Sequence, residues 1–162
     1  MKRLFVLMTL MLSAVPVSAK ENAVLPAFDV YFNGNKVESE FREYPLLVCK
    51  DITYFPMTYF DSRHLGLTTE WDNDTRTLYN DQGNITCAYR DYKWENKNEK
   101  SNVVNGCNFN IVVNGKEIDN AKEPYPIITF RDVTYFPLTW RFAVDEFGWE
   151  YSYDHENGLV IN

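Results

Sequence analysis

One eight-residue pattern occurs twice in the chain, at residues 51–58 (DITYFPMT) and again 81 residues later at 132–139 (DVTYFPLT). Six of the eight positions are identical, and the other two exchange one apolar residue for another. Self-similarity at a fixed spacing indicates a chain built from two related units. The positions that we expect to have structural roles are Asp51, Tyr54, Phe55, Pro56 and Gly66 in the first unit and Asp132, Tyr135, Phe136, Pro137 and Gly148 in the second.

The first nineteen residues have the pattern of a secretory signal peptide. Lys2 and Arg3 precede an apolar run over 4–15, and the sequence VSA at 17–19 supplies the small residues of a cleavage site. The run is shorter than the roughly 20 residues that a membrane-spanning helix needs. We therefore expect cleavage after Ala19, export from the cell, and no integral membrane segment in the mature chain.

The rest of the sequence divides into three parts. A first unit is expected at 20–82, an inter-unit strand and polar loop at 83–106, and a second unit at 107–162. The whole chain carries a formal net charge of −7, and loss of Lys2 and Arg3 makes it −9. Such a charge argues against a nucleic-acid partner, because binding to phosphates needs a basic face.

Both units show the same order of local signals. Asn-Gly pairs at 33–34 and 114–115 favour two-residue type I′ hairpin turns, and second hairpins are expected across 50–51 and 131–132. One short helix is expected over 57–65 and another from Pro137 onward, and a further strand is expected over 85–92. The second helix should bury one face made of Trp140, Ala143, Val144 and Phe147. The predicted fold class is α+β, with antiparallel β-hairpin-rich sheets and one short helix in each of two related repeat units.

This order of features resembles the stalk-domain family, also called the copper amine oxidase N-terminal-like domain. The resemblance is carried by Asn33-Gly34, Tyr54-Phe55-Pro56-Met57, Leu65-Gly66, Trp71-Asp72 and Leu78, and by Asn114-Gly115, Tyr135-Phe136-Pro137-Leu138, Phe147-Gly148, Tyr153-Asp154 and Val160-Ile161. Thr58 and Thr139 depart from the pattern, because the family has Arg two residues after the Pro. The resemblance implies an antiparallel sheet around a short helix, on secreted or surface-attached bacterial proteins, without a catalytic role.

No catalytic or metal-binding constellation stands out in the sequence. His64 and His155 are the only histidines, and a copper or zinc site needs three or four ligands. We therefore expect no metal, no cofactor and no copper amine oxidase activity. No Gly-x-Ser-x-Gly motif occurs, whereas acidic residues are plentiful, so a carboxylate pair of the glycosidase kind stays open.

Cysteines and aromatic rings supply the remaining candidates. Export permits a disulfide, and Cys87 and Cys107 are the pair that we expect to form it, while Cys49 is expected to be buried. Each Tyr-Phe pair of the repeated motif should bury one ring and expose the other, because strand side chains alternate. Tyr92 and Trp94 are the candidate exposed rings for contact with a partner, and packing between the units is their alternative role.

We expect a secreted, non-enzymatic binding or scaffold module that acts outside the cell or at the bacterial cell surface. Its expected partner is a cell-surface polymer or another secreted protein. Two alternatives stay open: a small secreted hydrolase that uses Asp and Glu residues, and an accessory or inhibitor partner of another secreted enzyme.

Overall fold

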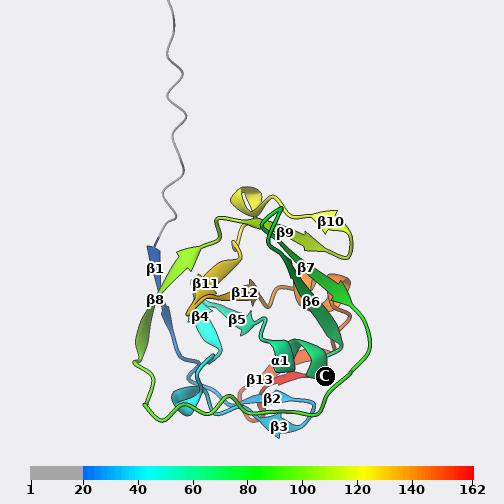
Figure 1. The fold of residues 1–162 in the computed structure, drawn as a ribbon. Coiled ribbons are helices and arrows are strands. Elements are labelled where there is room, and N and C mark those ends of the chain that lie inside the picture. Colours follow the sequence, from blue (N-terminus) through cyan, green and yellow to red (C-terminus); the bar gives the residue numbers. More distant parts are fainter. Residues whose placement is uncertain (1–19) are drawn as a thin grey trace, which may run out of the picture.

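The computed structural model describes residues 20–162, and its centre is a closed barrel of six strands in the order β1-β4-β5-β12-β11-β8 (Figure 1). The signal peptide expected at 1–19, with its cleavage site after Ala19, lies outside the described residues. The barrel strands are β1 (Lys20–Val24), β4 (Leu47–Cys49), β5 (Ile52–Pro56), β8 (Ser101–Gly106), β11 (Ile128–Phe130) and β12 (Val133–Pro137).

The expectation of an α+β fold with one helix in each repeat unit is wrong. Strands make up 42% of the structure and helices only 13%. The helical segments are α1 (Tyr59–His64), the π-helix η3 (Arg141–Glu146) and two 3₁₀ turns, η1 (Ser39–Phe41) and η2 (Asn120–Lys122). Helices of six residues or fewer are too short to form a layer, so the architecture is decided by strand pairing.

The two copies of the repeated motif lie side by side at the centre of the molecule. Strands β5 and β12 pair antiparallel, with Phe55 opposite Phe136. Alternation directs Tyr54 and Tyr135 into the barrel, where every strand contributes to an apolar cluster. Phe55 and Phe136 point the other way, into a second and larger core. Both rings of each pair are therefore buried, and the expectation of one exposed ring is wrong because both faces of these strands are covered.

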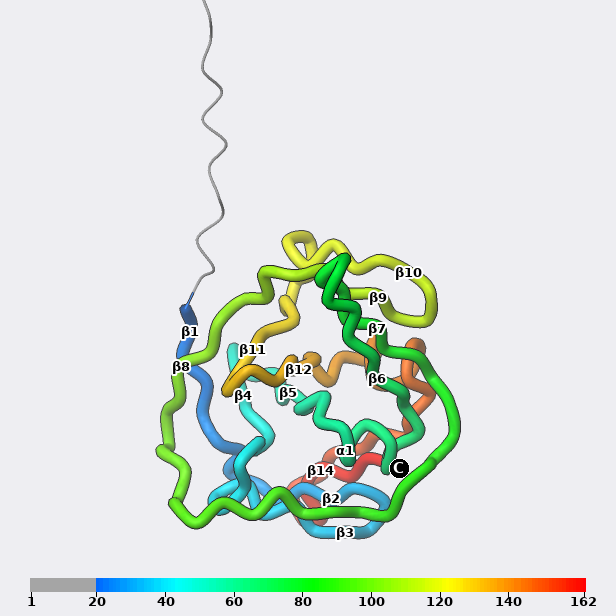
Figure 2. Tube along the Cα trace, viewed as in Figure 1, coloured from blue at the N-terminus to red at the C-terminus, as the bar shows by residue number. Residues whose placement is uncertain are grey.

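Two four-stranded sheets flank the barrel, in the orders β10-β9-β7-β6 and β13-β14-β2-β3. Each sheet joins a hairpin of the N-terminal half to a hairpin of the C-terminal half through one parallel pair, β7–β9 or β14–β2. Figure 2 shows the blue β2 and β3 beside the red C-terminal strand β14. Neither half could therefore complete its sheets alone. The bounds are β2 (Val30–Phe32), β3 (Asn35–Lys36), β6 (Leu67–Asp72), β7 (Thr77–Gln82), β9 (Asn110–Val113), β10 (Lys116–Glu117), β13 (Tyr151–Asp154) and β14 (Gly158–Ile161).

The expected hairpin turns are confirmed. Asn33 and Asn114 have φ angles of 45° and 49°, and each is followed by a glycine with positive φ, as a type I′ turn requires. The asparagine side chains also fasten the turns to the helices. Asn33 Nδ2 donates to the backbone oxygen of His64 at 2.9 Å, and Asn114 Nδ2 donates to that of Glu146 at 2.7 Å.

The second helical segment buries a different set of residues from the one that a period of 3.6 residues predicts. Segment η3 is a π-helix, and the N–H of Phe147 donates to the oxygen of Phe142, five residues earlier, at 3.0 Å. This wider turn buries Phe142 and leaves Trp140 67% exposed, so the prediction of a buried Trp140 is wrong. Pro137 ends strand β12 and does not begin the helix. Gly66 and Gly148 follow the two helical segments, as expected.

Residues 83–100, here called the strap, connect β7 to β8 along the outside of the molecule (Figure 1). The prediction of a strand over 85–92 is wrong. The regular strand between the two halves is β8. It pairs with β1, which the sequence did not predict, and this pairing helps to close the barrel. The strap is bound to the segment around η1. Backbone N–H groups of Glu43, Trp94 and Asn98 donate to oxygens of Tyr92, Phe41 and Glu40, each at 2.8 Å. These bonds make the strap an integrated part of the fold.

Alanine in place of Gly158 is expected to cost about 1–3 kcal/mol more than alanine in place of Gly34. Both glycines have positive φ, 74° and 78°, so both variants pay the same left-handed strain. Only at Gly158 would the added Cβ meet backbone, 2.2 Å from the oxygen of Asp29, which accepts a hydrogen bond from Leu159 N. Urea unfolding of the two variants measures the difference, and equal losses would contradict the expected clash.

Candidate functional site

One hollow on the surface, here called groove 1, has a volume of about 900 Å³. It lies between the chain that leaves β1, the segment from β3 to η1, and the β13–β14 turn. Phe28 and Tyr153 form its aromatic wall, with ring centroids 5.0 Å apart in an edge-to-face arrangement. Its size is within the range of small-molecule binding sites, roughly 300–1,000 Å³.

The β13–β14 turn is locked by one carboxylate. Asp154 Oδ1 accepts hydrogen bonds from the backbone N–H groups of Glu156 and Asn157 at 2.8 and 2.7 Å. The side-chain hydrogen bond from Asn157 and these backbone bonds hold the pKa of Asp154 below its usual range. The turn places His155 beside Tyr153, with ring centroids 5.8 Å apart. Tyr153 stays 49% exposed and can meet a ligand.

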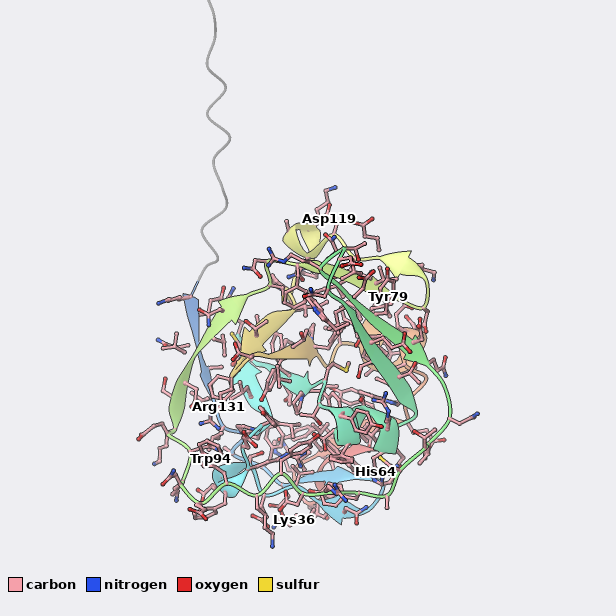
Figure 3. All side chains as sticks on the ribbon, viewed as in Figure 1. Lys36, His64, Tyr79, Trp94, Asp119 and Arg131 are labelled. Atoms are coloured by element: carbon pink, nitrogen blue, oxygen red, sulfur yellow. The ribbon has the colours of Figure 1, made fainter. Side chains whose placement is uncertain are left out.

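Charged side chains also line the rim of groove 1. Lys36 Nζ lies 3.1 Å from Asp29 Oδ1 and 3.9 Å from Glu38 Oε1. The hydrogen bond to Asp29 raises the pKa of Lys36. Figure 3 shows Lys36 at the lower edge of the molecule, with its amine extending outward. The groove therefore offers both an apolar ring surface and hydrogen-bonding groups of both charges.

A second hollow, here called groove 2, has a volume of about 340 Å³ and an aromatic pair of the same kind. Trp71 and Phe109 lie with ring centroids 5.3 Å apart and ring planes at 89°. These residues correspond in the sequence alignment of the two halves to Tyr153 and Phe28. The same pair of positions therefore lines a groove on each four-stranded sheet.

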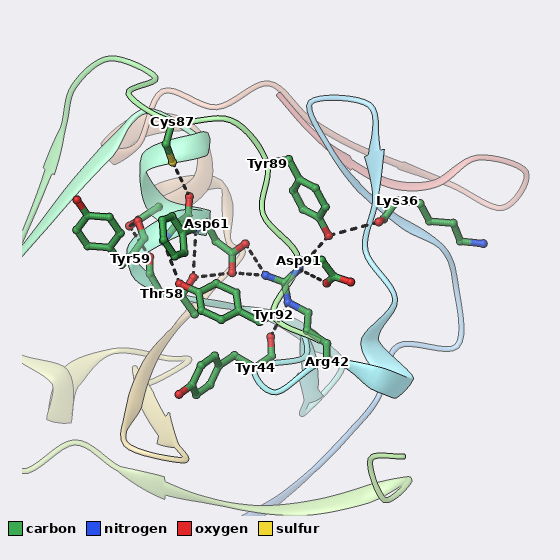
Figure 4. Close-up of polar contacts among 12 residues, drawn as sticks. Lys36, Arg42, Tyr44, Thr58, Tyr59, Asp61, Cys87, Tyr89, Asp91 and Tyr92 are labelled. Atoms are coloured by element: carbon green, nitrogen blue, oxygen red, sulfur yellow. Dashed lines mark hydrogen bonds and ion pairs between the residues drawn. The ribbon is translucent and has the colours of Figure 1, made fainter. Parts of the chain in front are cut away.

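A buried polar cluster joins the strap to helix α1 (Figure 4). Arg42 is fully buried, and its guanidinium pairs with both carboxylate oxygens of Asp61. It also donates to Tyr89 Oη at 3.2 Å and to the backbone oxygen of Tyr44 at 3.1 Å, and Asp91 lies 3.8 Å away. Burial opposes the charge of Arg42, but the Asp61 carboxylate outweighs it and raises the pKa of Arg42. A fully buried cation cannot meet a ligand, so this cluster is structural.

The rings expected to be exposed, Tyr92 and Trp94, are half-buried and occupied within the protein. Tyr92 Oη accepts a hydrogen bond from the N–H of Phe60 at 3.1 Å, and its ring packs on Tyr44. The guanidinium of Arg131 lies 4.9 Å from the ring centre of Trp94, and Figure 3 shows these two residues next to each other. The position of Trp94 in a polar segment could not reveal this contact, because Arg131 is distant in sequence. Among residues 20–162, the exposed large rings are Phe41, Tyr59, Trp71, Trp140 and Tyr153.

The disulfide expected between Cys87 and Cys107 is not formed, because Cys49, Cys87 and Cys107 are all free thiols in the structure. Cys87 Sγ donates to the oxygen of Phe60 at 3.5 Å, while Cys107 packs against the larger core. The two cysteines therefore serve different contacts.

Native Cys49 and Cys107 are expected to resist alkylation at pH 8. Burial raises the pKa of Cys49 to about 11, with help from Glu21, and raises that of Cys107 to about 12. At pH 8 both are almost wholly thiols, whereas the thiolate is the reactive form. Intact-mass analysis after iodoacetamide treatment should show both unmodified in the native protein and modified in urea. Equal reaction rates in the two conditions would contradict this.

Within residues 20–162, no three His, Cys, Asp or Glu side chains gather in a way that could hold a metal ion. Across the same residues, no helix is long and apolar enough to cross a membrane. No family model matches the chain, and no curated protein or solved structure matches it either.

Proposed function

We propose that this protein is a secreted, non-enzymatic binding module whose groove 1 holds a sugar unit of a polymer at the cell surface or outside the cell. The observation that carries the proposal is the half-exposed Phe28–Tyr153 pair in a groove of about 900 Å³. A pyranose ring has an apolar C–H face and a rim of hydroxyl groups. The aromatic wall suits the first, and the charged rim with Asp29, Lys36 and Glu38 suits the second.

Membership of the stalk-domain family and export are part of the same proposal. They are supported by the repeated motif and by the basic and apolar start of the sequence. We also propose that the two halves are copies of one unit. Matched turns support this: the backbone φ angles at Lys50 and Asp51 are 50° and 63°, and those at Arg131 and Asp132 are 48° and 62°.

Retention on purified polysaccharide tests the proposal. Affinity electrophoresis through gels containing cell-wall or extracellular polysaccharide should retard the native protein. Tyr153→Ala should weaken retention about tenfold, since loss of one stacking ring is worth roughly 1–1.5 kcal/mol. Trp140→Ala is the matched control, because Trp140 is exposed and lies outside groove 1.

Three outcomes would each contradict part of the proposal. Retention that Tyr153→Ala leaves unchanged would exclude groove 1 as the binding site. Release of reducing ends from the polysaccharide would favour the hydrolase alternative, for which groove 1 supplies the carboxylates of Glu38, Glu40 and Glu156. Co-purification of a secreted enzyme without any polysaccharide retention would favour the accessory or inhibitor alternative.

A further inference from the structure

We propose that groove 2 binds the protonated amine of an unacetylated amino sugar, with the sugar ring against Trp71. This inference rests on the proposed function, because it takes the ligand to be a sugar, and it adds a second binding site for that ligand. Groove 2 and groove 1 share no lining residue, so each can be tested while the other is intact.

The aromatic side of groove 2 suits a cationic ring. Trp71 is 49% exposed, and the edge-to-face contact with Phe109 holds its indole in place. Met57 and Leu78 add apolar surface. An ammonium group over an exposed indole face is attracted to the π electrons of the ring, and the C–H face of the sugar adds apolar contact.

The charges of groove 2 are of one sign. Glu70 and Asp132 line it, and no Lys, Arg or His does. Neither carboxylate forms a salt bridge with any group in the described part of the chain. An adjoining hollow that shares Phe109 and Asp132 contains one basic residue, Lys20. Groove 2 therefore selects for an ammonium group against a neutral amide or an anion.

A threonine adds a hydroxyl to groove 2. Thr134 lines the groove and is only 8% exposed. Its backbone oxygen accepts a hydrogen bond from the N–H of Met57 at 2.8 Å, which holds this part of strand β12 in place. A ligand N–H placed beside the hydroxyl oxygen would find a hydrogen-bond acceptor there.

Comparison of the two sheets explains why groove 2 is open. Trp71 pairs with Leu78 and Thr69 with Asn80, while Tyr153 pairs with Leu159 and Tyr151 with Ile161. Thr69 thus occupies the register position of Tyr151, which packs against the larger core. The small threonine leaves space beside Trp71 where the other sheet has a ring. Thr69→Tyr should fill groove 2 from within the fold.

A matched pair of tetrasaccharides provides the test. Isothermal titration at pH 6 compares the glucosamine tetramer, which is cationic, with its fully N-acetylated counterpart, which is neutral. The cationic tetramer should bind at least about tenfold more tightly, and added salt should weaken it. Trp71→Ala, Thr69→Tyr and Glu70→Gln should each reduce that preference. Trp140→Ala should leave it unchanged, because Trp140 is an exposed ring that lines neither groove.

Four results would overturn the inference, and three of them come from the tetramer titrations. They are equal binding of the two tetramers, no binding of the cationic tetramer, and a preference that survives both Trp71→Ala and Thr69→Tyr. Tighter binding of Nα-acetyl-lysine amide than of the tetramer would reject the sugar and assign the site to a protein amine. Polysaccharide retention in the Tyr153→Ala variant tests groove 1, whereas the tetramer preference tests groove 2. Failure of the proposed function and failure of this inference are therefore distinguishable.

Discussion

Replacement of Arg42 by alanine is expected to lower the free energy of unfolding by about 3–5 kcal/mol. The substitution leaves the Asp61 carboxylate buried without its cation. It also removes the hydrogen bond to Tyr89, which fastens the strap. Urea unfolding measures the loss, and limited proteolysis should show faster cleavage within 83–100.

Lys122→Ala is the matched control. Lys122 Nζ lies 2.7 Å from Asp119 Oδ2, and the two side chains are 84% and 55% exposed, so the expected loss is no more than about 1 kcal/mol. The double variant Arg42→Met with Asp61→Leu removes both buried charges and should be less destabilised than Arg42→Ala. Equal losses in Arg42→Ala and Lys122→Ala would contradict the role of the buried ion pair.

Phe55→Ala is expected to destabilise the protein by about 3–5 kcal/mol, and Phe136→Ala by a similar amount. Phe55 is fully buried and packs on Phe32 and Trp149, with centroid distances of 5.3 and 4.9 Å. Phe136 packs on Phe142 and Phe147 at 5.2 and 5.4 Å. Each deletion leaves a cavity where the paired strands β5 and β12 meet the larger core.

Thermal and urea unfolding of these variants measures the effect. Phe41→Ala is the control, because Phe41 is an aromatic residue that is 48% exposed, and its expected loss is within about 0.5 kcal/mol. A loss at Phe55 as small as that at Phe41 would contradict a core built on the paired motif strands.

Local signals predicted most of the hairpins correctly. These hairpins form at the Asn-Gly turns and across 50–51 and 131–132. Each turn needs only two neighbouring residues with positive φ, so a short stretch of sequence is enough to predict it. The second helix was predicted wrongly, because the assumed period of 3.6 residues does not hold in a π-helix. Tertiary packing of Phe142, not local preference, decides which face is buried.

The candidate sites were less accessible to sequence reasoning. Trp71 and Tyr153 were visible as parts of the repeated pattern, but their exposure depends on which residues the sheets place beside them. Phe28 reaches Tyr153 only because β2 pairs with β14 across almost the whole chain length. Nothing in the sequence indicated that Arg42 is buried in an ion pair, because arginine is seldom buried and its partner Asp61 lies on another element.

The sequence by itself determined the doubled motif, the hairpin turns and the acidic charge, because each depends on residue identity or on contacts between near neighbours. Only the tertiary structure decided that the two motif strands pair, that six strands close a barrel, and that each flanking sheet takes hairpins from both halves. The physical reason is that strand pairing and apolar burial join residues far apart in the chain. The grooves arise where those long-range pairings leave aromatic rings uncovered.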